Sequence, residues 1–468
     1  MSTVVAFGCT PFHTADTEDA AVSHEGGAFD AGALHADGGA IHDAGLHREG
    51  ATLDGSASVV VDATVDAPAT LDTVCGYPWS EVNMCTGRSV SVLGSVQFSD
   101  DPRISFARSE GGTLGICYAD DSNDDFLTRY VRAVTFKAPG LSIPQPTAVT
   151  LFMGSESDTT PACAIGGGAG DTFHVLVNDT DDEVLGYGEL VGGTMPAYNL
   201  FGPSPIDGYL TLGVVAVDPA HVMAAVGDNV TETIQSYLVT PYDGGANIAT
   251  PATVESSIGI SLLGAGQFSL RSGGAPEMLI DMEPGDAAGS RADLAVWNGS
   301  SWKVQTIEGN ALDAAIGYGP SLAVTDGGFR AVYYEQNPGT SDAGTAQIHV
   351  ATFSTLGGAP TAITRPIDAS LDNDPSGPLV GAAAAVGPDG RLFIAYVAYS
   401  PTSKSEVLYL ARPESAVPGA PFITDTIDNQ LSAADPPSVN LIVEPSGRVD
   451  IVYMRLEANS VYFATRDP

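Results

Sequence analysis

From about residue 97 onward, short runs of alternating apolar and polar residues are separated by turns that contain glycine. Residues 320–324 (PSLAV) precede the turn TDGG and residues 329–334 (FRAVYY) follow it. Residues 437–443 and 448–454 flank the turn EPSG in the same way. Apolar runs with a two-residue period on both sides of a glycine turn predict β-hairpins.

This hairpin pattern recurs with a period of about 56 residues, which indicates a repeat architecture. Each hairpin is followed by a third and a fourth apolar run, such as 347–353 (QIHVATF) and 361–368 (TAITRPID). Four short antiparallel strands per repeat are typical of a propeller blade, and no sustained helical period is present. The sequence therefore predicts an all-β fold, a seven-bladed β-propeller of four-stranded blades. Its seven tight turns end at Gly112, Gly170, Ala220, Gly274, Gly328, Gly390 and Gly447.

One position inside the repeat is always a large and mostly apolar residue. It lies six residues after the end of each tight turn, where a large side chain would fill the space between stacked sheets. We therefore interpret these residues as core positions rather than ligand contacts: Tyr118, Leu176, Val226, Ile280, Tyr334, Tyr396 and Tyr453.

The last repeat contains three apolar runs and lacks a fourth. Residues 88–98 (RSVSVLGSVQF) have no turn partner of their own, and we expect them to supply the missing outer strand. Such closure removes the exposed strand edges of an open array. The propeller is thus predicted to occupy residues 73–468.

Residues 10–72 form a segment biased toward Ala, Asp, Gly and His, whose only aromatic residues are Phe12 and Phe29. This composition cannot bury enough apolar surface to offset its ordering entropy, so we expect a disordered linker. Cys9 follows the short apolar run VVAFG, a pattern similar to the lipobox, in which a small residue precedes a cysteine that becomes lipidated.

The lipobox-like Cys9 and the Asp-Ala-Gly linker resemble the beginning of secreted bacterial lipoproteins. The resemblance covers the first 70 or so residues and is compositional. It implies that residues 1–9 are the remnant of an export signal and that Cys9 carries the lipid. It further implies an exported protein anchored to the outer membrane through that lipid alone, in the periplasm or on the cell surface.

Four cysteines remain, and an even number fits two disulfides in an oxidising compartment. Cys75 and Cys85 lie just before the predicted closing strand, where a disulfide would close a small loop. Cys117 lies on the second strand of the first repeat and Cys163 on the first strand of the second. Because these strands are neighbours near the axis, we expect a bridge between blades.

The chain carries 57 acidic against 18 basic residues, a net charge of −39, so nucleic acid is not an expected partner. Carboxylates gather in the loops between the second and third strands of the first two repeats, and we call this predicted surface the acidic face. Oxygen-rich clusters suit Ca²⁺, which is the one cofactor that these loops predict. Alternatively, the carboxylates form a solvated surface or reflect adaptation to salt. The candidate calcium ligands are Asp120, Asp121, Asp124, Asp125, Asp179, Asp181 and Asp182.

No catalytic motif accompanies this fold: Walker loop, HExxH, GxSxG and CxxC patterns are all missing from the sequence. Sialidases are similar in strand plan, but their S-x-D-x-G-x-x-W motif is missing too. Our hypothesis is a monomeric, non-enzymatic, surface-exposed binding or scaffold module for an unknown protein or glycan at the acidic face. The alternative is a secreted glycan-active hydrolase of the sialidase-like propeller type.

Overall fold

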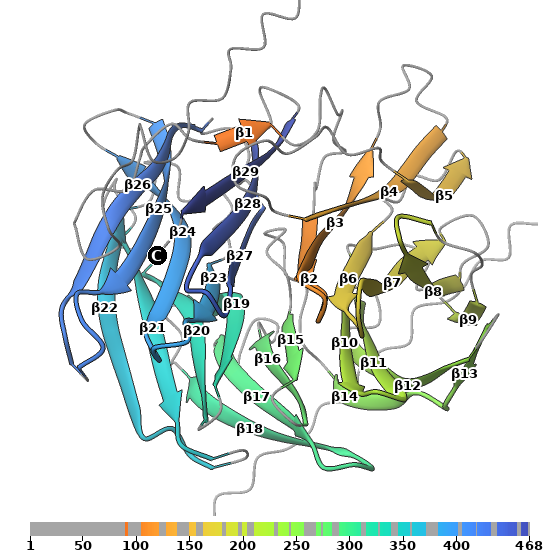
Figure 1. Ribbon diagram of the computed structural model, residues 1–468. Helices are drawn as coiled ribbons and strands as arrows, with labels where there is room; N and C mark the ends of the chain where they lie inside the picture. Colours follow the sequence, from red (N-terminus) through yellow and green to blue (C-terminus); the bar gives the residue numbers. More distant parts are fainter. Residues whose placement is uncertain are drawn as a thin grey trace, which may run out of the picture. The chain divides into compact units, whose positions relative to one another are not determined.

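The computed structural model describes residues 89–91 and, with gaps at many of the loops, residues 104–466. All of these residues belong to the unit Thr64–Pro468. They form seven antiparallel sheets, which Figure 1 shows arranged around a ring. No helix in the described part of the chain has the length and hydropathy needed to span a bilayer.

The first three blades follow one another along the chain. The first contains β2 (Ile104–Arg108), β3 (Thr113–Asp120), β4 (Thr128–Lys137) and β5 (Val149–Ser155). The second contains β6 (Cys163–Gly167), β7 (Thr172–Asp179), β8 (Val184–Val191) and β9 (Asn199–Pro203). The third contains β10 (Leu210–Asp218), β11 (His221–Asp228) and β12 (Thr233–Tyr242), and its outer position is shared by β13 (Gly245–Ile248) and β14 (Ala252–Ser256).

The fourth to sixth blades repeat the same order. The fourth contains β15 (Phe268–Ser272), β16 (Pro276–Met282), β17 (Arg291–Trp297) and β18 (Trp302–Gly309). The fifth contains β19 (Ala315–Thr325), β20 (Gly328–Asn337), β21 (Thr345–Phe353) and β22 (Ala362–Ser370). The sixth contains β23 (Ala383–Val386), β24 (Leu392–Ser400), β25 (Ser405–Pro413) and β26 (Phe422–Leu431).

The seventh blade joins the two ends of the described chain. It contains β27 (Val439–Val443), β28 (Val449–Arg455) and β29 (Ser460–Arg466), with the short strand β1 (Ser89–Ser91) as its outer strand. Strand β1 pairs antiparallel with β29, so that Val90 lies opposite Phe463. These three residues fall within the segment 88–98, from which the sequence predicts the closing strand.

The first strand of every blade contacts the first strand of the next blade. These contacts run through β2, β6, β10, β15, β19, β23 and β27 and return to β2, which makes the ring continuous. The predicted all-β, seven-bladed propeller of four-stranded blades is therefore confirmed. The expected boundaries at residues 9 and 72 lie outside the described residues.

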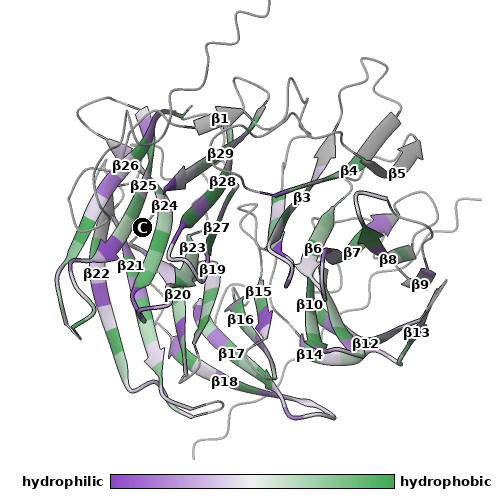
Figure 2. Cartoon of the chain, in the orientation of Figure 1, coloured by the Kyte–Doolittle hydropathy of each residue, from purple (hydrophilic) through white to green (hydrophobic). Residues whose placement is uncertain are grey.

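The core lies between neighbouring blades, because each sheet packs both of its faces against the sheets beside it. Figure 2 shows the resulting hydrophobic positions along the middle of the strands. All seven residues that lie six positions after a tight turn are buried, including Tyr118, Tyr334 and Tyr453. Tyr334 and Tyr396, for example, share one cluster between the fifth and sixth blades. The interpretation of this position as packing is confirmed.

Candidate functional site

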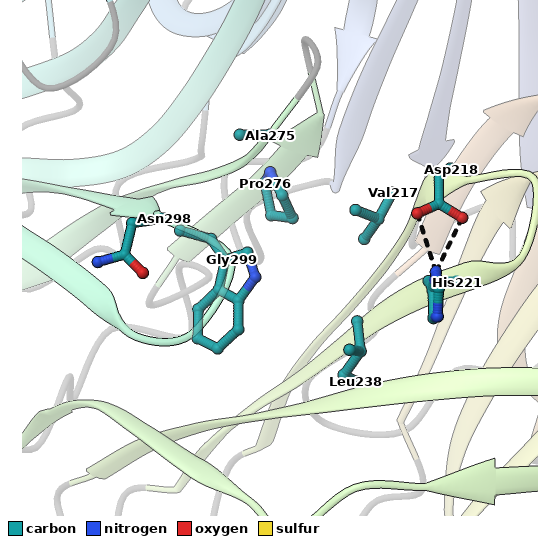
Figure 3. A pocket seen from close by; sticks show the side chains of 9 residues that line it. Val217, Asp218, His221, Leu238, Ala275, Pro276, Asn298 and Gly299 are labelled. Carbon is teal, nitrogen blue, oxygen red and sulfur yellow. Dashed lines mark hydrogen bonds and ion pairs between the residues drawn. The ribbon is translucent and has the colours of Figure 1, made fainter.

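A cavity of about 470 Å³ lies between the third and fourth blades. It opens beside the turn that joins β10 to β11 and the turn that joins β17 to β18. Figure 3 shows Asp218 and His221 on one side of this cavity and Pro276 and Asn298 on the other. The residues that line it are Val217, Asp218, His221, Leu238, Ala275, Pro276, Trp297, Asn298 and Gly299.

A tight turn holds the polar side of the cavity. Asp218 ends β10 and lies opposite His221, the first residue of β11. The Asp218 carboxylate accepts a hydrogen bond from the backbone N–H of Ala220 at 2.7 Å, which is the arrangement of an Asx turn. The Nδ1 atom of His221 lies 2.9 Å from both carboxylate oxygens. The turn therefore fixes a carboxylate–imidazole pair at the mouth of the cavity.

This pair keeps the carboxylate ionised. The hydrogen bond from His221, with a smaller contribution from the backbone N–H of Ala220, holds the pKa of Asp218 below its usual value. Both side chains remain open to solvent, at 47% exposed for Asp218 and 40% for His221. A ligand can thus reach a negative charge whose position is set by the turn.

Two tryptophans flank the turn of the fourth blade. Trp297 ends β17 and pairs in register with Trp302, the first residue of β18. Their ring centroids are 5.5 Å apart, and the rings are inclined at 57°. The indole N–H of Trp302 donates to Ser236 Oγ in the third blade at 2.7 Å. Trp302 therefore bridges the two blades and supports Trp297, which lines the cavity.

A second polar cluster lies between the fourth and fifth blades. The Nδ1 atom of His349 is 2.8 Å from Glu308 Oε2, and its Nε2 atom is 2.7 Å from Glu335 Oε2. Tyr333 also donates to Glu308, at 2.8 Å, and Arg365 lies 3.2 Å from the other oxygen of that carboxylate. The hydrogen bond with His349 is the main reason why the pKa of Glu308 lies below its usual value. Because these groups bond to one another around a fully buried His349, we assign the cluster to the blade interface.

The structure describes two of the five cysteines that the sequence analysis singled out. Cys117 in β3 and Cys163 in β6 form a disulfide that joins the first two blades, with their Cα atoms 6.3 Å apart. The predicted bridge between blades is therefore present. Cys9, Cys75 and Cys85 lie outside the described residues.

The predicted calcium ligands lie at the ends of two second strands or beyond them. Asp120 ends β3 and Asp179 ends β7, on neighbouring blades. The other members of that set lie outside the described residues: Asp121, Asp124, Asp125, Asp181 and Asp182. Within the described part of the chain, no group of three His, Cys, Asp or Glu residues could hold a metal ion. The calcium site therefore stays a prediction.

Sequence reasoning missed the cavity, although the chain contains a signal for it. Two of its three tryptophans, Trp297 and Trp302, flank one short turn. The turn at residues 218–221 is also the one tight turn that an imidazole follows directly. These two signals lie about 80 residues apart, and only the packing of blade against blade brings them together.

No protein-family model matches the chain, and no curated protein does. Solved propellers resemble its fold. The α-L-arabinanase of Penicillium chrysogenum, solved with arabinobiose, shares 11% identity over 81% of this chain and 98% of its own, with a TM-score of 0.47. The propeller domain of the Trilobed protease from Pyrococcus furiosus shares 7% identity over 80% and 97%, with a TM-score of 0.44. The Aleuria aurantia lectin, in complex with α-methyl-L-fucoside, shares 12% over 72% and 99%, with a TM-score of 0.40. At such values these likenesses carry no functional inference.

Proposed function

We propose that this protein is a non-enzymatic binding module and that its ligand is a saccharide held in the cavity between the third and fourth blades. One observation carries the proposal: a single cavity combines the indole of Trp297 with the carboxylate–imidazole pair of Asp218 and His221. Ligand pockets of about 300–1,000 Å³ commonly pair apolar and aromatic walls with a few placed polar groups. The C–H face of a sugar ring packs on such a wall while its hydroxyls reach the polar groups.

The same cavity favours binding over the alternative of a glycan-active hydrolase. Glycoside hydrolysis generally uses two carboxyl groups, one of them protonated, at separations of about 5–9.5 Å. Asp218 is the one carboxylate among the described residues that line this cavity. Its lowered pKa keeps it ionised, whereas a general acid needs a raised pKa. These features suit recognition of a ligand more than cleavage of one.

This proposal moves the expected ligand site away from the acidic face. The acidic loops follow the ends of β3 and β7, which are second strands, whereas the cavity adjoins the ends of β10 and β17, a first and a third strand. In an antiparallel blade, second strands end at the opposite face from first and third strands. A ligand at the acidic face stays a separate prediction.

Binding to an array of microbial and plant oligosaccharides tests the proposal. We expect the unmodified protein to retain a subset of these glycans and Trp297→Ala to lose at least tenfold in affinity for them. Tyr242→Ala is the matched control, because Tyr242 is 54% exposed and lies outside the cavity lining. Retention that survives Trp297→Ala would place the ligand elsewhere. Release of shortened sugars, measured by mass spectrometry, would establish the hydrolase instead.

We further propose that the chain is exported and that a lipid on Cys9 anchors it to the outer membrane, so that the propeller faces the periplasm or the cell exterior. The proposal rests on the apolar run before Cys9 and on the linker composition that follows it. Expressed behind a lipoprotein leader in a Gram-negative host, the protein should incorporate radiolabelled palmitate, and Cys9→Ser should abolish the label. Label that persists in Cys9→Ser would refute the anchor.

A further inference from the structure

The cavity between the third and fourth blades offers a ligand hydrogen-bond acceptors and negative charge. Its lining contains no lysine or arginine among the described residues. The Nδ1 atom of His221 lies 2.9 Å from both oxygens of Asp218, so this edge of the imidazole is already used within the turn. The carboxylate of Asp218 has lone pairs beyond those used by His221 and Ala220. Against this carboxylate, a ligand must bring the donor.

Most of the side-chain amide of Asn298 is used within its own turn. Its Oδ1 accepts hydrogen bonds at 3.0 Å from the backbone N–H groups of Ser300 and Ser301. Its Nδ2 donates at 3.0 Å to Ser301 Oγ. The amide thus holds its own turn together, and the Asp218 carboxylate is the one acidic group among the described residues of the lining.

The remaining walls are apolar or aromatic. Trp297 presents an indole, the ring whose π face attracts cations most strongly, and Val217, Leu238 and Pro276 complete the lining. The net charge of −39 adds a long-range field that attracts cations. A fixed carboxylate, an indole and a negative field together select a positively charged group on a body with an apolar face.

Building on the proposed saccharide-binding function, we propose that this cavity selects an amino sugar whose amine is free and protonated. The ammonium would lie against the Asp218 carboxylate while the C–H face of the sugar ring packs on Trp297. A lysine side chain carries the same charge, but holding its flexible stem in one conformation costs side-chain entropy. A rigid sugar ring avoids most of that cost, which favours the amino sugar.

Titration calorimetry with two matched tetrasaccharides tests the selection. The probes are the β-1,4-linked tetramer of glucosamine and its fully N-acetylated counterpart, which share the ring and linkage but differ in charge. We expect the protein to bind the amine form at least tenfold more tightly. Asp218→Asn should bring the two affinities to within about threefold by weakening the amine form. Trp297→Ala should weaken both.

Asp389→Asn is the matched control for charge and for turn geometry. Asp389 also lies in a tight turn, and its Oδ1 accepts from the backbone N–H two residues later, as Asp218 does. This variant removes one negative charge outside the cavity and should keep the tenfold preference. Melting curves of both Asn variants should overlay that of the unmodified protein, since an Asn side chain can still accept the turn hydrogen bond.

The possible failures separate the two proposals. If the unmodified protein binds both tetramers equally and Trp297→Ala binds neither, the amine preference is wrong. The proposed saccharide-binding function would still stand. An amine preference that Asp218→Asn leaves unchanged would also overturn it. Tighter binding of tetralysine than of the glucosamine tetramer, dependent on Asp218, would replace the amino sugar with a basic peptide. If Trp297→Ala weakens the binding of no saccharide, either on the array or in the calorimeter, the proposed function itself fails.

Discussion

His174 is buried in the second blade and is uncharged at neutral pH. Burial lowers its pKa to about 4. Its Nδ1 atom lies 2.8 Å from the hydroxyl of Tyr187 and 3.5 Å from a carboxylate oxygen of Glu189. Burial also raises the pKa of Tyr187, so that hydroxyl stays protonated beside Nδ1. The contact with Glu189 is therefore not an ion pair at neutral pH.

This burial predicts a loss of stability in mild acid. The folded-state pKa lies below the ordinary value of 6.5, so stability is fully present above pH 6.5 and is lost as the pH falls toward 4. The loss amounts to about 3 kcal/mol, since one pKa unit corresponds to about 1.4 kcal/mol. His174→Gln cannot titrate and should lose correspondingly less between pH 7 and 4.5, measured by urea unfolding.

Asp450 changes stability with pH in the opposite direction. The pH profile of the variant must therefore be compared with that of the unmodified protein. Burial raises the pKa of Asp450 to about 6, and its stabilising contribution is present below about pH 4 and lost as the pH rises through 6. The difference between His174→Gln and the parent cancels this term. His42→Gln, which changes a histidine of the segment 10–72, is the control. Identical pH profiles for His174→Gln and the parent would contradict the prediction.

At the scale of the strand, hydroxyl groups tie neighbouring blades together around the axis. Ser321 Oγ in β19 accepts from the backbone N–H of Ala384 in β23 at 2.8 Å. Ser269 Oγ in β15 accepts from Leu322 in the same manner, at 3.1 Å. Similar bonds join Ser105 to Ile165, and Ser438 to Ile104. Each bond satisfies a backbone N–H that the strand pairing within its own sheet does not use.

Removing one such hydroxyl should destabilise the ring measurably. Ser321 and Ala384 are both buried, so Ser321→Ala leaves the backbone N–H of Ala384 without a partner. An unsatisfied buried donor costs about 1–3 kcal/mol, and we expect that decrease in the free energy of unfolding. Ser354→Ala, at an exposed position, is the control and should stay within about 0.5 kcal/mol. Equal effects of the two substitutions would refute the role of the hydroxyl.

The repeat could be predicted at this scale because its signals are local. Alternation of apolar residues and a turn glycine lie within about fifteen residues of each other, and both reflect the backbone of a single hairpin. Tyr334 and Tyr396 were placed in the core by their distance from a turn alone, and both are buried. The division of one outer position between β13 and β14 had no such signal: β13 pairs with residues 239–242 of β12, and β14 pairs with residues 233–236.

The cavity could not be predicted, because it depends on contacts between blades. Asp218 and Trp297 belong to different repeats, and neither breaks the pattern of its own hairpin. Asp is common before a turn and Trp is common in strands, so neither residue stands out within its own hairpin. Only the stacking of the third blade on the fourth places them around one space. Local pattern therefore predicts the blade, whereas the cavity depends on how two blades pack together.

At the scale of the molecule, the ring is held closed at two places of different kinds. The disulfide between Cys117 and Cys163 joins the first and second blades covalently. The seventh blade is completed by β1, which precedes the first blade in sequence and pairs with the last strand of the chain, β29. The seventh blade is thus built from both ends of the described chain.

Deleting residues 86–97 from the full chain removes β1 and tests this closure. Strand β29 would keep β28 on one side and expose its other edge, and exposed edges promote pairing between molecules. Each lost backbone hydrogen bond removes about 1 kcal/mol, so we expect a lower melting temperature together with concentration-dependent aggregation in light scattering. Deleting residues 10–70, a longer stretch outside the strands of the ring, should change neither property. An unchanged melting temperature after loss of residues 86–97 would mean that three paired residues contribute nothing to closure, and that the contacts of β27 with β2 hold the junction unaided.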